Sequence, residues 1–190
     1  MEERLTYGPA RTDDDLRGIQ AIQAANLPDT LTEEESREQG FVSIRHELDL
    51  LRLMNQPHGH TVARDASGRV VGYALVMEPR HRETVPFLLR FFTLLDTLTY
   101  RGKPLAGYRY FSMGQIAVAK DYRGQGVFRG LYHDLFTRTA PHFDLVVTAI
   151  ALSNVRSRRA HERVGFEDLH FYEQDGKEWV VVGVSIGRGE

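Results

Sequence analysis

The sequence contains no cysteine, no long apolar run and no strong excess of either charge. Without cysteine there is no disulfide framework, so nothing points to the secreted, disulfide-rich class. The longest apolar stretch, residues 87–98, is interrupted by Arg90 and Asp96, whereas spanning a bilayer takes about 18 apolar residues. The acidic start Met-Glu-Glu-Arg does not have the layout of a signal peptide. We therefore expect a cytoplasmic protein with no membrane partner.

Charge is balanced overall but uneven along the chain. The formal net charge of −2 gives no overall attraction to nucleic acid or anionic lipid, so we expect no nucleic-acid partner. Residues 1–40 hold ten acidic and four basic side chains, whereas residues 120–163 hold eight basic and four acidic ones. Such a basic region suits a compact polyanion, for example a phosphorylated cofactor, although solvated helix faces would give the same pattern.

The 190 residues, 42% of them hydrophobic, are enough for a single domain, 1–190, with its own core. Residues 1–58 are mostly helical in pattern, with a capping box at Thr12 and Asp15. Residues 60–187 alternate between strand and helix patterns, which predicts a mixed α/β fold. We expect strands at 4–9, 60–64, 70–78, 108–119, 145–150, 166–172 and 178–186, and helices beginning near residues 13, 33, 41, 86, 126 and 154.

A strand that leads through a glycine-containing loop into a helix gives the strongest signal for ligand binding. The segment runs from Gln115 to Phe128, with Arg123-Gly-Gln-Gly126 directly before the helical pattern. Helix N-terminal N–H groups are unpaired, the helix dipole favours anions there, and glycine lets phosphate approach the main chain. The segment lacks the Gly-Lys-Ser/Thr of a P-loop and the third glycine of a dinucleotide fingerprint, at Arg129. Tight turns also use glycine for geometry alone, so both interpretations stay open.

A second polar pattern lies near the end of the chain. Asn154, Ser157 and His161 are spaced by three and four residues, which places them on one face of a helix that follows a strand. Such rows face solvent more often than they catalyse. The opposite face carries Val155 and Arg159, so this row is not simply the complement of an apolar stripe.

The glycine segment resembles the pyrophosphate signature of the GNAT superfamily of acyl-CoA N-acyltransferases. That signature reads Gln/Arg-x-x-Gly-x-Gly/Ala, and Arg123 and Gly126 match its first and fourth positions. Phe128 stands at the sixth position, where Gly or Ala is usual, and its bulk would shift the loop or the first helical turn.

The second segment is similar to a later pattern of the same family. Asn154, Ser157 and Gly165-Phe166 match it, while His161 stands where the family often has Tyr. By element order the resemblance covers about residues 60–187, and the N-terminal helices fit the family's variable region. Two partial motifs at the right separation are more specific together than either is alone.

The resemblance implies a GNAT-like α/β domain whose central mixed, mostly antiparallel sheet has splayed fourth and fifth strands and is flanked by helices. The pantetheine arm of coenzyme A would lie between those two strands and pair with the main chain at the end of the fourth. The loop amides would wrap the pyrophosphate. The implied cofactor-binding residues are Ile116, Ala117, Val118, Arg123, Gly124, Gln125, Gly126, Val127, Phe128 and Asn154.

The implied activity is N-acetyl transfer, with acetyl-CoA as co-substrate. A primary amine of a small molecule or a peptide would attack the thioester directly, and other short acyl groups remain open. The N–H of Val118 would polarise the carbonyl, and His161 would protonate the leaving thiolate. The alternative for His161 is packing beside the cofactor without a proton role. Residues 1–58 would lie on the side of the amine acceptor. A homodimer is possible, because many members of the family form dimers.

Other assignments are weaker. Glu78, Glu83 and His133 are candidates for the base that deprotonates the amine, but no spacing selects among them, and a chain of water molecules would serve as well. His58 and His60 have no further ligand nearby, so we expect no metal. The rival interpretation is an acyl-CoA-binding sensor or interaction module without catalysis, motivated by Phe128 and the missing Tyr. A third is nucleotide binding by another phosphate-loop family.

Overall fold

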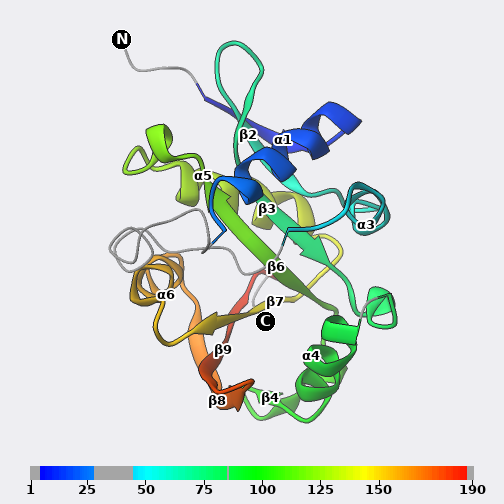
Figure 1. Ribbon diagram of the computed structural model, residues 1–190. Coiled ribbons are helices and arrows are strands. Elements are labelled where there is room, and N and C mark those ends of the chain that lie inside the picture. Colours follow the sequence, from blue (N-terminus) through cyan, green and yellow to red (C-terminus); the bar gives the residue numbers. More distant parts are fainter. Residues whose placement is uncertain (1–4, 28–44, 85, 188–190) are drawn as a thin grey trace. The chain divides into compact units, whose positions relative to one another are not determined.

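The computed structural model describes residues 5–27, 45–84 and 86–187 (Figure 1). The short acidic helix expected after Thr32 lies outside these ranges, as do Phe41 and Ile44 of the next apolar stripe. None of the helices in the described ranges is both long enough and apolar enough to cross a membrane.

The described helices and strands follow the predicted order, with two differences: a short hairpin at residues 99–104 was not predicted, and residues 45–47 of the helix expected from residue 41 are not helical. The helices are α1 (Asp13–Ala24), α3 (Leu48–Met54), α4 (Pro86–Asp96), α5 (Val127–Thr139) and α6 (Val155–Glu162). Three short 3-10 turns are η2 (Pro79–His81), η3 (Leu105–Gly107) and η4 (Lys120–Tyr122). The strands are β1 (Thr6–Pro9), β2 (Thr61–Arg64), β3 (Val70–Met77), β4 (Thr99–Tyr100), β5 (Lys103–Pro104), β6 (Tyr110–Val118), β7 (Leu145–Ala151), β8 (Glu167–Gln174) and β9 (Lys177–Ser185).

Hydrogen bonds join seven strands in the order β1-β2-β3-β6-β7-β9-β8. The pairs β1/β2, β2/β3, β7/β9 and β8/β9 are antiparallel, and β6/β7 is parallel. The prediction of a mixed, mostly antiparallel sheet flanked by helices is therefore confirmed. The β6/β7 ladder joins Tyr110–Ser112 to Leu145–Val147. The splay of these two strands, which are fourth and fifth in the sheet, stays a prediction.

The chain forms two compact units, residues 1–76 with 114–138 and residues 77–113 with 139–190. In the first unit the predicted capping box starts α1, because Thr12 Oγ1 accepts from the N–H of Asp15 and Asp15 Oδ2 accepts from the N–H of Thr12. The apolar stripe that follows, Leu16, Ile19 and Ile22, is buried as expected.

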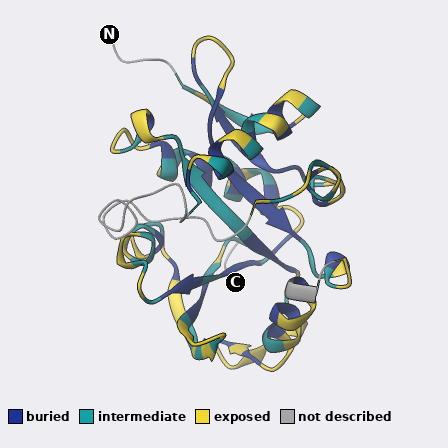
Figure 2. Cartoon of the chain, viewed as in Figure 1, coloured by how far each residue is buried: buried dark blue, intermediate teal, exposed yellow. Residues whose placement is uncertain are grey.

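Strand β3 is buried along its whole length, and helices pack closely on both of its faces (Figure 2). On one face α1 approaches so closely that a Cβ at Gly18 would lie 2.7 Å from the Cβ of Val70. On the other face α5 packs over Gly72, where a Cβ would lie 3.1 Å from Val127 and 3.2 Å from Leu131. These two glycines let the helices sit directly on the strand.

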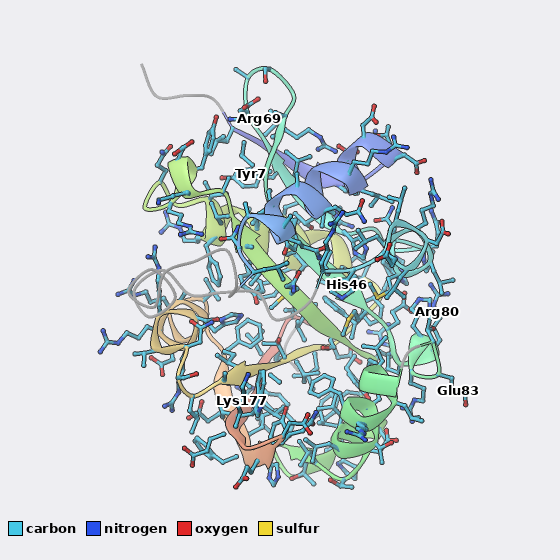
Figure 3. The ribbon with its side chains drawn as sticks, in the orientation of Figure 1. Tyr7, His46, Arg69, Arg80, Glu83 and Lys177 are labelled. Atoms are coloured by element: carbon cyan, nitrogen blue, oxygen red, sulfur yellow. The ribbon has the colours of Figure 1, made fainter. Side chains whose placement is uncertain are left out.

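Helix α3 joins the same face as α1 through a buried histidine. His60 Nδ1 accepts from the N–H of Val76 (3.0 Å), so its Nε2 carries the proton and donates to Leu51 O (3.1 Å). Edge strand β1 lies against α5. The Tyr7 ring of β1 covers Gly130 of α5 so closely that a Cβ at Gly130 would lie 2.3 Å from it (Tyr7 is labelled in Figure 3). The first unit is therefore a layer of strands between two layers of helices.

In the second unit β7 and β9 supply the core with rows of buried aliphatic residues, and Leu88, Phe91, Phe92 and Leu95 of α4 are buried. The hairpin β4–β5 was not predicted, because its residues had the composition of a loop. Its turn places Arg101 at φ 48° and Gly102 at φ 79°. Arginine rarely adopts the left-handed conformation, so its presence does not predict such a turn. In the structure Arg101 forms an ion pair with Glu167 (2.6 Å) and stacks on Tyr100.

The close approach at Gly18 predicts that this position does not tolerate alanine, although alanine is the better helix former. Gly18→Ala should lower the free energy of unfolding by about 1–3 kcal/mol, because the Val70 Cβ belongs to a buried strand and has little room to move. Urea unfolding followed by circular dichroism measures the change. Gly8→Ala, where a Cβ meets nothing within 4 Å, is the control and should change stability by less than about 1 kcal/mol. Equal stabilities of the two variants would contradict the packing described for α1.

Candidate functional site

The end of β6 presents main-chain groups on the side away from β3. Just beyond the strand, Ala119 donates its N–H to Val71 O (2.8 Å) on β3. Because successive residues of a strand direct their N–H and C=O groups to opposite edges, Ile116 and Val118 direct theirs away from β3, whereas those of Ala117 face β3. Of the predicted strand-end residues, Ile116 and Val118 can therefore pair with a ligand through the main chain, and Ala117 can contribute its side chain.

The loop between β6 and α5 depends on two left-handed glycines. Gly124 has φ 77° and Gly126 has φ 78°, and a Cβ at either would meet nothing within 4 Å. Backbone conformation, not lack of space, therefore requires glycine here. Helix α5 begins at Val127, with its first intrahelical bond from Gly130 N to Gly126 O (3.0 Å). The exposed loop and the first amides of this 13-residue helix are the groups that were predicted to bind an anion, and that role stays a prediction.

Arg123, the first residue of the signature, uses its donors within the protein. Its N–H donates to Lys120 O (3.3 Å), its Nε donates to Val118 O (3.1 Å), and its Nη2 donates to Asn26 Oδ1. The side chain therefore ties the loop to the end of β6 and to the residues after α1. These contacts favour a supporting role for Arg123 over the ligand contact that the resemblance implied.

Phe128 does not disturb the first turn of α5. The half-buried ring lies along the helix, with its centroid 5.1 Å from that of Tyr132, and Tyr132 is in turn 5.1 Å from Phe136. The helix still begins at Val127, as the sequence pattern predicted. The bulk of Phe128 is thus accommodated by an aromatic row, and the backbone of the cradle keeps its helical geometry.

In the second unit, Asn154 and His161 occupy the two ends of α6. Asn154 is the N-cap, and its Oδ1 accepts from the N–H of Ser157 (3.2 Å). His161 is only 2% exposed, and its ring lies edge-on to Phe166 at 5.1 Å. Gly165 follows with φ 97°, which ends the helix where the sequence predicted.

The contacts of His161 define its protonation. Nδ1 lies 2.7 Å from Ser157 O, and since a carbonyl can only accept, the proton is on Nδ1. Burial lowers the pKa of His161 to about 4, so the ring is neutral at pH 7 and Nε2 carries no proton. These features favour the packing role for His161 over the proton donor that was the other alternative.

Comparisons with known proteins show the family of this chain. The sequence profile of the Acetyltransferase (GNAT) family matches residues 22–166. The chain belongs to the GNAT acetyltransferase family. No curated protein sequence matches the chain.

Solved structures of GNAT acetyltransferases share the fold. The ribosomal-protein-S18-alanine N-acetyltransferase from Escherichia coli is 12% identical with a TM-score of 0.64, covering 98% of this chain and 97% of that chain. A phosphinothricin acetyltransferase from Sinorhizobium meliloti, solved with AcCoA, is 20% identical with a TM-score of 0.62, covering 97% and 90%. A chain of the NatC complex bound to Gag peptide and CoA is 13% identical with a TM-score of 0.63, covering 96% and 98%. At these identities the likeness shows the fold alone.

A partly buried chain of polar side chains in this GNAT fold was not predicted. Tyr73 Oη donates to Gln115 Oε1 (2.7 Å), Gln23 Nε2 donates to the same oxygen (2.7 Å), and Gln23 Nε2 also lies 2.9 Å from His46 Nδ1. Because the N–H of His46 donates to Gln23 Oε1, the amide orientation is fixed, and His46 Nδ1 is an acceptor. Burial lowers the pKa of His46 to about 4. The only sequence signal was a glutamine, Gln23, inside an apolar helical stripe.

The three side chains considered as the base differ in their surroundings. Glu78 forms an ion pair with Arg80 (3.3 Å), while Glu83 and His133 are exposed (Glu83 and Arg80 are labelled in Figure 3). Within the described ranges, no three His, Asp or Glu side chains gather in a way that could hold a metal ion.

The environment of His161 predicts that its ring does not titrate near neutrality. In ¹⁵N NMR of labelled protein, the His161 ring should stay neutral and Nδ1-protonated from pH 8 down to about pH 5, because burial opposes the charged form. The urea-unfolded protein gives the reference titration. A midpoint at or above the unfolded value would instead restore His161 as a candidate acid.

Proposed function

We propose that this chain is an N-acetyltransferase that transfers the acetyl group of acetyl-CoA to a primary amine of a small molecule or a peptide. The observation that carries the proposal is the exposed loop with two left-handed glycines, Gly124 and Gly126, between the end of β6 and the N-terminus of α5. Membership of the GNAT family supports it, because acetyl-CoA is the co-substrate of that family.

The first unit would bind the pyrophosphate and the pantetheine arm of the cofactor through different main-chain groups. The pyrophosphate carries negative charge and suits the amides of Gly124 to Phe128, where the α5 dipole adds a favourable field. The pantetheine arm is uncharged and carries amide groups, which suit the main-chain groups of Ile116 that point away from β3. The carbonyl of Val118 already accepts from Arg123 Nε (3.1 Å), which leaves its N–H for the thioester. Asn154 stays a predicted contact of the pantetheine arm, although its Oδ1 already caps α6.

The proposed reaction is direct attack. The neutral amine nitrogen forms a bond to the thioester carbonyl carbon, the carbonyl oxygen gains negative charge, and the N–H of Val118 donates to it. Such a donor is commonly worth about 10²-fold or more in rate. The C–S bond then breaks, and the amide and the CoA thiolate separate.

The proton balance needs no charged histidine. The attacking nitrogen becomes positively charged when it bonds to carbon, so it has a proton to lose as the sulfur leaves. That proton ends on the thiolate, directly or through water, and the products are the acetylated amine and free CoA. A neutral His161 is compatible with this path, because no other group has to supply a proton to the sulfur.

Acetyl transfer predicts stabilisation by the cofactor and release of free thiol. Acetyl-CoA at about 100 times its Kd should stabilise the fold by about 2.7 kcal/mol, seen as a raised melting temperature, with ATP and NAD as controls. Mixed with amines, the protein should release CoA thiol, which Ellman's reagent detects without background because the chain has no cysteine. The panel should contain peptide N-termini and small amino compounds. Stabilisation without thiol release from any amine would favour the non-catalytic sensor, and stabilisation by ATP or NAD alone would favour a nucleotide site.

The left-handed loop predicts a selective effect of alanine. Gly126→Ala and Gly176→Ala place alanine at φ 78° and φ 70°, both in open space, so each should lose about 1 kcal/mol of stability. Only Gly126→Ala should weaken acetyl-CoA binding, by about tenfold or more in Kd, because it redirects the amides of the cradle. Isothermal titration calorimetry measures both. Equal affinities of the two variants would place the pyrophosphate elsewhere.

A further inference from the structure

A buried carboxylate lies between the β2–β3 turn and the start of the glycine loop. Asp65 is 7% exposed and accepts five hydrogen bonds. Its Oδ1 accepts from Ser67 N (2.9 Å), Ser67 Oγ (2.6 Å) and Arg69 N (3.0 Å). Its Oδ2 accepts from Arg69 Nε and from Tyr122 Oη, each at 3.1 Å. The first four bonds shape the turn, but the fifth leads to another element.

Tyr122 is the last residue of η4 and directly precedes Arg123. It is 6% exposed, its N–H donates to Ala119 O (2.9 Å), and its hydroxyl accepts from Arg69 Nη2 (3.2 Å) while donating to Asp65. The Arg69 guanidinium also lies over the Tyr122 ring, 5.7 Å from its centroid (Figure 3 labels Arg69 at the hairpin). The phenol is therefore fixed by its ring and by its hydroxyl.

The Asp65 carboxyl is ionised at neutral pH. The hydrogen bonds from Ser67, Arg69 and Tyr122 hold the pKa of the Asp65 carboxyl below its usual range. The carboxylate consequently stays ionised and remains an acceptor for the Tyr122 hydroxyl. A hydrogen bond to a charged group is stronger than a neutral one, so this contact is suited to hold one end of a loop.

The loop itself has few means of fixing its own conformation. Gly124, Gln125 and Gly126 are exposed, and neither glycine has a neighbour within 4 Å of a Cβ position. Gln125 Nε2 donates to Asp121 O (2.8 Å), and Gly126 O accepts from Gly130 N where α5 begins. The start of the loop is fixed by Tyr122 and Arg123. Arg123 ties the loop to β6, whereas Tyr122 ties it to the β2–β3 turn.

We propose that Asp65 and Tyr122 are positioning residues that hold the glycine loop ready for the pyrophosphate of coenzyme A. The inference rests on the proposed function and names residues outside the cradle that set its affinity. Preorganised amides bind a ligand without first losing conformational freedom. Releasing the Tyr122 anchor should therefore weaken ligands that contact the loop, and leave the chemical step at the thioester unchanged.

The test compares Tyr122→Phe with Tyr108→Phe, a matched control whose hydroxyl donates to Tyr100 O (3.0 Å) in the β4–β5 region. Dissociation constants are measured for CoA and for pantetheine, which lacks the pyrophosphate, by NMR titration. Tyr122→Phe should raise the Kd for CoA about five- to tenfold, as expected for a lost hydrogen bond to a charged group, and leave the Kd for pantetheine unchanged. Tyr108→Phe should match the wild type with both ligands.

Kinetics and a second variant complete the test. With a working amine, Tyr122→Phe should raise the KM for acetyl-CoA and keep kcat within about twofold. Asp65→Asn should reproduce this pattern, and the double variant should be no weaker than the worse single one, because both changes break the same contact. An unchanged Kd for CoA, or an equal loss for CoA and pantetheine, would overturn the positioning role. A wild type that binds neither ligand would instead overturn the proposed function.

Discussion

The candidate site depends on one backbone constraint, the left-handed conformation of Gly124 and Gly126 between β6 and α5. With these two φ values the chain turns from the strand end into the helix through three exposed residues, 124–126. The elements on either side are rigid, because Ala119 is bonded to β3 and α5 packs on Gly72. A short glycine-containing loop is therefore held between a strand and a helix that are both well packed. Such an arrangement lets a phosphate approach the main chain.

Side chains that looked like ligand contacts serve the protein's own structure. Arg123 bonds to Val118 and Asn26, Asn154 caps α6, and His161 donates to the Ser157 carbonyl. Helix ends and strand ends leave main-chain groups that must be satisfied, and nearby polar side chains satisfy them. The contacts proposed for the cofactor are then mainly those of backbone amides. That division explains how the fold can tolerate Phe128 where the family usually has a small residue.

Local signals were sufficient for most of the fold. The capping box at Thr12 and the start of α5 after Gly126 each depend on residues within a few positions of one another, and the structure has both. The β4–β5 hairpin was missed because Arg101 takes a conformation that its residue type does not favour. Contacts with Glu167 and Tyr100 hold it there, and neither contact is visible in the local sequence.

The sequence by itself determined the family and most of the order of elements, and it predicted a phosphate site at Gly124 and Gly126, since these depend on spacing and on glycine's conformational freedom. Only the tertiary structure decided which polar side chains remain for function. Burial sets the charge of His161, and the chain from Tyr73 through Gln115 and Gln23 joins residues up to 92 positions apart. Desolvation and long-range hydrogen bonds arise only when distant segments meet, so no local pattern encodes them.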